Sequence, residues 1–188
     1  YVALTIAIIG TWVRFDLSQY SWKTGSSQML RNKNMRWASN LFHVGILGLI
    51  FGHLIGMLTP SFIYEIFITP GQKQIMAIVI GGIAGVLCWI GLAMLLWRRF
   101  TDDRISHTSS FSDKFILILL FIQLNLGMIS IYFSMGHLDG STMVKLAGWA
   151  QDITIFRPLQ ALAKLDGVHV VYQLHMALGI TLIAIFPF

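Results

Sequence analysis

The sequence predicts an all-α integral membrane protein, a bundle of five transmembrane helices. Of its 188 residues, 56% are hydrophobic and 11% are charged, with a mean hydropathy of +0.72. A soluble domain has about a quarter of its residues charged. Apolar residues form continuous runs whose lengths are close to the about 20 residues that a helix needs to cross a bilayer. The runs lack the alternation of apolar and polar residues that transmembrane barrel strands show.

Four apolar runs are long enough to cross a membrane as helices: 41–58, 75–97, 115–133 and 168–188. A fifth run, 1–13, is shorter. The chain begins inside this run without a methionine and ends inside the apolar sequence LIAIFPF, so we expect the natural protein to extend beyond both ends. The runs contain no internal repeat, and we expect one transmembrane domain over 1–188.

Basic residues in the connections predict the orientation of the helices. The first and third connections are rich in cations: Arg14, Lys23, Arg31, Lys33, Arg36, Arg98, Arg99, Arg104 and Lys114. The second connection contains a single cation, Lys73, and the cations of the fourth connection are balanced by acidic residues. Because lysine and arginine favour cytoplasmic loops, we expect the N-terminus outside and the C-terminus in the cytoplasm. This placement explains the net charge of +5 without a nucleic-acid partner.

Histidines inside the predicted helices are the first candidates for function, because an ionisable group in the membrane interior is costly unless it is satisfied. His43 and His53 lie ten residues apart in one run, which is about 15 Å along a helix axis. His175 lies about two turns into the last run. In the predicted orientation His43 lies toward the cytoplasm. His53 and His175 have similar depths near the outer side and can face each other.

Three functions suit such histidines. Two imidazoles from different helices can bind one haem iron, histidine can relay protons or ions, or each ring can simply be hydrogen-bonded between packed helices. Glycines surround the histidines at Gly45, Gly48, Gly52 and Gly56. They make room for a flat macrocycle, or for close helix packing. The five runs contain no aspartate or glutamate for a proton relay, which favours a holder of haem.

Other polar and reactive residues have simpler interpretations. His107 and His137 lie in connections, where we expect them to be solvated. His169 precedes His175 by six residues, about 120° away around a helix, so both cannot bind one haem. We expect His169 to be an interfacial residue, and it is the alternative ligand if His175 is not one. Cys88, the single cysteine, lies in an apolar run and is expected to be a buried thiol.

Several segments resemble one known family: SSQML, ASNLFHVGILGLIFGHLIGMLTP, GWAQ, LDGV and QLHMALGITLIAIFPF. They are similar to the gamma subunit of respiratory membrane-bound nitrate reductase, a dihaem cytochrome b that anchors the enzyme and oxidises quinol. The resemblance implies two b-type haems. It assigns His53 and His175 to the outer haem and His43 to the inner haem. The second ligand of the inner haem is expected to be a histidine shortly after Phe188.

The resemblance also implies a quinol site beside the outer haem, formed by Gly52, His53, Gly56 and Lys73. Lys73 can donate a hydrogen bond to a quinone oxygen or a haem propionate, or it can be a lysine that extends to the membrane interface. Three arginines at the cytoplasmic rim are candidates for pairing with inner-haem propionates, although ordinary cytoplasmic-side cations are the favoured interpretation: Arg36, Arg98 and Arg99.

A complete reaction follows from the resemblance. Menaquinol or ubiquinol is oxidised on the outer side of a bacterial or archaeal cytoplasmic membrane, and its protons leave there. Electrons pass through the two haems to a cytoplasmic iron–sulfur subunit and then to a molybdenum subunit that reduces nitrate. The chain itself has no cysteine cluster for an iron–sulfur centre. The alternatives are a haem-free membrane anchor and the cytochrome b subunit of another quinone-linked reductase.

Overall fold

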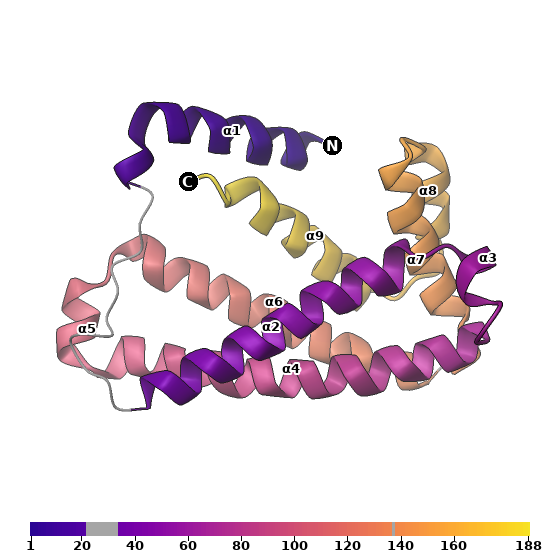
Figure 1. Cartoon of the computed structure of the whole chain (residues 1–188), viewed down its shortest axis with the longest axis horizontal. Coiled ribbons are helices and arrows are strands. Elements are labelled where there is room, and N and C mark those ends of the chain that lie inside the picture. The colour runs from indigo at the N-terminus through magenta and orange to yellow at the C-terminus, as the bar shows by residue number, and fades with distance from the viewer. Residues whose placement is uncertain (22–33, 137) are drawn as a thin grey trace.

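The computed structural model describes residues 1–21, 34–136 and 138–188, and in this part of the chain every regular element is helical (Figure 1). The all-α prediction is therefore confirmed for the described residues. The segment SSQML, the cations Lys23, Arg31 and Lys33, and His137 lie outside them.

Five helices form the bundle: α1 (Val2–Ser18), α2 (Met35–Leu58), α4 (Pro70–Thr101), α6 (Phe111–Met135) and α9 (Val170–Ile185). In space, α2 packs against α4, α4 against α6, α6 against α9, and α9 against α1. Figure 1 shows α1 and α9 side by side, with the three long helices beneath them. Each of the five predicted apolar runs therefore contributes one helix.

Three of these helices are long and apolar enough to cross a membrane: α2, α4 and α6. They contain the predicted runs 41–58, 75–97 and 115–133 and extend beyond them at one or both ends. Helix α9 is apolar but has 16 residues, and α1 has 17. The length and composition of the three long helices agree with the predicted membrane protein, whereas the full set of five spans stays a prediction.

The connections lie at opposite ends of the bundle in the predicted alternation. Helix α5 (Asp103–Thr108), in the basic third connection, lies at the same end as the end of α1 and the start of α2 (Figure 1). Helices α3 (Ser61–Tyr64), α7 (Ser141–Thr154) and α8 (Pro158–Lys164) lie at the other end. The first and third connections therefore share one end, as the charge pattern predicts. Which end faces the cytoplasm stays a prediction.

Capping residues begin two of the long helices. At α4 the Thr69 hydroxyl accepts a hydrogen bond from the backbone N–H of Gln72, whose side chain accepts one from the backbone N–H of Thr69. Pro70 occupies the first turn, where a missing N–H costs nothing. Ser110 and Asp113 make the same reciprocal pair at α6. These capping boxes satisfy backbone donors that a helix start leaves without partners.

Small residues bring α2 and α4 together. A side chain added at Gly45 would place its Cβ 2.6 Å from Cβ of Cys88, and one at Gly91 would lie 2.8 Å from Cα of Phe42. Cys88 and Leu92 are each 1% exposed at this contact. The expected buried thiol is confirmed, and the close approach follows the rule that small residues let membrane helices touch.

The connections contain helices that the sequence analysis did not predict, of which α7 bears most directly on the bundle. Its Gln151 side chain donates hydrogen bonds to the backbone oxygens of Met57, at 2.9 Å, and Thr59, at 3.2 Å. The carbonyls at the end of a helix have no partner within that helix. Helix α7 supplies a hydrogen-bond donor to these carbonyls of α2 and thereby packs against this end of the bundle.

Candidate haem and quinol site

Helices α2 and α9 approach each other through two histidine rings. The ring centres of His53 and His175 lie 6.1 Å apart, with the ring planes inclined by 36°. Away from this point α2 packs on α4 and α7, and α9 packs on α6 and α1. The structure therefore brings together the two histidines that residue counting places at similar depths.

Hydrogen bonds to backbone oxygens set the same tautomer in both rings. Nδ1 of His53 lies 2.7 Å from the backbone oxygen of Leu49, and Nδ1 of His175 lies 3.1 Å from the backbone oxygen of Gln123. A carbonyl oxygen only accepts, so Nδ1 must carry the hydrogen in each neutral ring. Nε2 of each ring then carries the lone pair, which is what a metal needs. At His175 the side-chain nitrogen of Gln123 lies 3.5 Å from this Nε2.

The spacing of the pair fits one metal ion held between the rings. A metal–imidazole bond is about 2 Å long and Nε2 lies about 1 Å from the ring centre, so two axial imidazoles have centres roughly 6 Å apart. Within residues 1–21, 34–136 and 138–188, no three or more histidine, cysteine, aspartate or glutamate side chains are grouped to hold a metal. A two-ligand site suits haem, because the macrocycle supplies the other ligands.

The glycine stripe of α2 divides into two parts. A Cβ on Gly45 would clash with α4, and one on Gly48 would lie 3.2 Å from Cβ of Ala84. At Gly52 and Gly56 an added Cβ would meet nothing within 4 Å. Helix packing therefore explains the first two glycines. The last two lie beside or near His53 and leave open space there, as a flat ligand requires.

His43 has the same local geometry as His53 but faces no second histidine in the described residues. Its Nδ1 lies 2.7 Å from the backbone oxygen of Ser39, one turn earlier, and 3.2 Å from the Ser39 hydroxyl. Its ring contacts Phe42 edge-on. Nε2 is again the nitrogen left for a ligand. The partner predicted for His43 follows Phe188 and is not among the residues of this chain.

His169 has a structural role that needs no ligand. Its Nδ1 accepts a hydrogen bond of 3.3 Å from the backbone N–H of Val171, so the side chain caps the start of α9. The ring stacks on Phe133 with 3.9 Å between the centres. His175, and not His169, faces His53. His107 lies exposed on α5, where the sequence analysis expected a solvated histidine.

Lys73 lies in a corner between α3 and the start of α4. The side chain is 9% exposed. Its Nζ lies 3.7 Å from the centre of the Tyr64 ring and 3.5 Å from the backbone oxygen of Thr59. Burial raises the pKa of Tyr64, and the neighbouring Glu65 carboxylate raises that pKa further. The phenol therefore stays neutral, and its ring face is a stable partner for the lysine cation.

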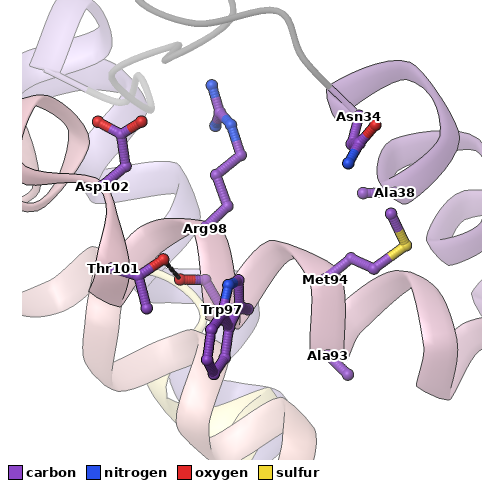
Figure 2. Close-up of a pocket in the computed structure, with 8 residues that line it drawn as sticks. All are labelled: Asn34, Ala38, Ala93, Met94, Trp97, Arg98, Thr101 and Asp102. Atoms are coloured by element: carbon purple, nitrogen blue, oxygen red, sulfur yellow. Dashed lines mark hydrogen bonds between the residues drawn. The ribbon is translucent and has the colours of Figure 1, made fainter.

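The three arginines considered for propionate binding lie at the opposite end. Arg99 donates to the Ser109 hydroxyl at 3.0 Å and lies 3.8 Å from the Asp113 carboxylate. Arg36 is exposed. Arg98 lines a cavity of about 590 Å³ between the start of α2 and the end of α4. Figure 2 shows the residues around this cavity: Asn34, Ala38, Ala93, Met94, Trp97, Arg98, Thr101 and Asp102.

Two residues around His175 escaped the sequence analysis. Gln123 and Gly127 are one turn apart on α6, and both contact the His175 ring or its backbone. The available signal was a polar glutamine in an apolar run followed four residues later by glycine. That pattern places both residues on one helix face, but it does not say what they contact.

Comparisons with known proteins give one consistent result. Residues 1–188 match the family model described as nitrate reductase gamma subunit. The chain is 50% identical, over its whole length and 83% of the relative, to the respiratory nitrate reductase 2 gamma chain of Escherichia coli K12. Identity to the respiratory nitrate reductase 1 gamma chain of the same organism is 49%, with the same coverage. The nitrate reductase gamma chain of Bacillus subtilis 168 is 32% identical, with 84% of its length covered.

Proposed function

The chain belongs to the nitrate reductase gamma subunit family, and from this premise we propose that it is the haem-carrying, quinol-oxidising membrane subunit of a respiratory nitrate reductase. The facing pair of His53 and His175 is the observation that carries the proposal. The pair joins two helices that otherwise pack on other neighbours, and the Nδ1 hydrogen bonds place the metal-binding lone pair of each ring on Nε2.

Two b-type haems are proposed for the chain. His53 and His175 hold the outer one, and His43 holds the inner one with a second histidine, which the family resemblance places after Phe188. Haem iron, when bound, takes up and releases single electrons, which is the chemistry required between quinol and the remaining subunits. The protein contributes the ligands, their orientation and a surrounding of low polarity.

Backbone carbonyls orient the three ligands. Each histidine donates its Nδ1 hydrogen to a carbonyl oxygen at 2.7 to 3.1 Å. Such outer partners fix the tautomer and make the ligand nitrogen more basic. For His43 and His53 the acceptor is one turn earlier in the same helix, so α2 itself sets both rings. For His175 the acceptor belongs to α6, so packing of α6 on α9 sets that ring.

The quinol is proposed to bind beside the outer haem, where Gly52 and Gly56 leave open space. A quinol ring is flat and can lie against a helix surface that lacks side chains. Lys73, held in the corner at Tyr64, supplies a positive N–H donor for a quinol oxygen. Oxidation frees the two quinol protons, and we assign their release to the end of the bundle that carries α3, α7 and α8.

The remaining features follow the topology. We assign five transmembrane helices, with the N-terminus outside and the C-terminus in the cytoplasm of a bacterium or archaeon. The end with α5 carries the basic connections and faces the cytoplasm. There the chain joins an iron–sulfur subunit and a molybdenum subunit that reduces nitrate. Electrons move inward while protons leave outward, and this separation of charge supports a membrane potential.

The first experiment is a reduced-minus-oxidised optical spectrum of the full-length protein within its complex, with haem counted per chain. Two b-type haems that are reduced by added quinol support the proposal. A folded, assembled protein without haem overturns it and leaves a membrane anchor. If haem is present but added quinol does not reduce it, the cytochrome assignment stands and the proposed quinol site is wrong. Copurification with an active nitrate-reducing subunit tests the partner separately.

A further inference from the structure

Gln123 of α6 contacts His175 of α9 through both its backbone and its side chain. The backbone oxygen of Gln123 accepts the Nδ1 hydrogen of His175 at 3.1 Å. The side-chain nitrogen of Gln123 donates to the backbone oxygen of His175 at 3.0 Å and lies 3.5 Å from its Nε2. One residue therefore contacts the ligand at both ring nitrogens and at its main chain.

Gly127 makes this contact possible. It lies one turn after Gln123, and in an α-helix its backbone N–H already bonds to the Gln123 oxygen. A carbonyl oxygen has a second lone pair, and the absent side chain of Gly127 lets His175 reach it. A Cβ at Gly127 would lie 3.0 Å from Cε1 of the His175 ring. The ring therefore occupies the space that a larger residue would fill.

The orientation of the Gln123 amide is determined by its partner. The backbone oxygen of His175 only accepts, so the amide nitrogen must face it. The amide oxygen is then buried without a hydrogen-bond partner in the described structure. Leaving a buried acceptor without a partner is costly, and such a group in a native protein calls for an explanation. Holding a donor beside His175 is the explanation that the contacts offer.

We propose that Gln123 is a positioning residue that raises the reduction potential of the outer haem. The inference rests on the proposed function, because it requires His175 to be a haem ligand. The amide N–H group brings partial positive charge close to Nε2, the nitrogen assigned to iron. Positive charge beside the iron disfavours the oxidised state, and the low polarity of the bundle strengthens the effect. The side chain also holds the α9 backbone, which fixes how the ring is turned.

The test is a redox titration of the intact complex carrying Gln123→Met, which keeps the length of the side chain and removes the donor. A single hydrogen bond corresponds to a factor of about three to ten in an equilibrium constant. We expect the outer haem to become harder to reduce by that factor, where tenfold is about 59 mV for one electron. The inner haem, on His43, is the reference within the same molecule and keeps its potential.

Gln173→Met is the matched control. Gln173 lies two residues before His175 on α9, but its side chain donates to the backbone oxygen of Val168 at 2.9 Å. If the contact between Gln123 and His175 is what raises the outer-haem potential, Gln173→Met leaves that potential unchanged. Gln123→Glu is a second variant of nearly the same shape. It replaces the donor by an acceptor, so its potential falls at least as far as that of Gln123→Met.

Electron paramagnetic resonance of the oxidised protein gives a second readout, because its signal depends on how the two axial rings are turned. Unchanged outer-haem potential and signal in both Gln123 variants overturn the inference while the haem assignment stands. If Gln123→Met binds no outer haem, the test rests on Gln123→Glu: a lowered outer-haem potential supports the inference, and an unchanged one overturns it. Wild-type protein without an outer haem contradicts the proposed function itself, so the two failures are distinct.

Discussion

His53 and His175 face each other across the space between α2 and α9, with 6.1 Å between their ring centres. Their helices are far apart in sequence and pack mainly on other neighbours. The donor hydrogen of each ring is engaged by a backbone oxygen, at 2.7 Å for His53 and 3.1 Å for His175. The hydrogen of each neutral ring therefore lies on Nδ1, and Nε2 is the nitrogen that we propose for haem iron.

Replacing one member of this pair removes one of the ligands proposed for the outer haem. We expect His53→Ala to lower the haem content of the complex by about half, because stable binding of the outer haem requires both imidazoles. The rate of quinol oxidation should fall below roughly a hundredth of the wild-type rate. The inner haem on His43 remains. Haem extraction, optical spectra and quinol-dependent nitrate reduction measure these effects.

His169→Ala is the control for that variant, since His169 lies six residues before His175 but caps α9 and stacks on Phe133. Both haems should remain, with a loss of about 1 kcal/mol in the free energy of unfolding from the missing cap. Loss of the outer haem in His169→Ala, with normal spectra in His53→Ala, would reverse the ligand assignment.

The two halves of the glycine stripe should respond differently to one added methyl group. Gly45→Ala forces α2 away from Cys88, and such overpacking costs about 1–3 kcal/mol of unfolding free energy. Gly52→Ala meets open space, so stability is unchanged or raised by up to about 1 kcal/mol through better helix propensity. Unfolding in detergent measures both. Equal destabilisation by the two changes would show that Gly52 packs against a neighbour after all.

Lys73→Met tests the proposed contact with quinol. The lysine carries the only cation of its connection and lies over Tyr64. Losing a charged hydrogen bond to substrate raises the KM for quinol about tenfold or more, with both haems retained. Steady-state kinetics with a soluble quinol analogue measure it. In the control Tyr64→Phe the ring that holds the lysine is kept, and KM should stay within about twofold. An unchanged KM in Lys73→Met would leave the lysine a purely structural role.

An ion pair joins α7 to α8 at the same end of the bundle. Nζ of Lys164 lies 2.6 Å from the carboxylate of Asp152; the aspartate side chain is 10% exposed, whereas the lysine side chain is 40% exposed. We expect Asp152→Asn to cost about 1–3 kcal/mol, between the values for surface and buried pairs. A double-mutant cycle with Lys164→Met isolates the pair. Strictly additive effects of the two changes would mean that the pair contributes no stability.

Sequence alone predicted the five apolar helices of the bundle and the class of protein. A run such as 41–58 must satisfy its backbone polar groups internally when surrounded by lipid, and a helix does so within one segment. Composition and run length therefore sufficed to predict α2, and the cations in the connections predicted which ends lie together. Depth along the helix axis also follows from counting residues, so His53 and His175 were placed at one level before any packing was known.

Only the tertiary structure decided which faces meet. Residue counting gives depth but not how α9 is turned, so His169 stays an alternative in the sequence. Its hydrogen bond with Val171 and its stacking on Phe133 give it a structural role instead. The glycines of α2 look alike in sequence, and contact with α4 divided them. Gln123 and Gly127 became part of the site through packing of α6 on α9. These are contacts between distant segments, which a local sequence pattern does not encode, because they depend on how whole helices pack against one another.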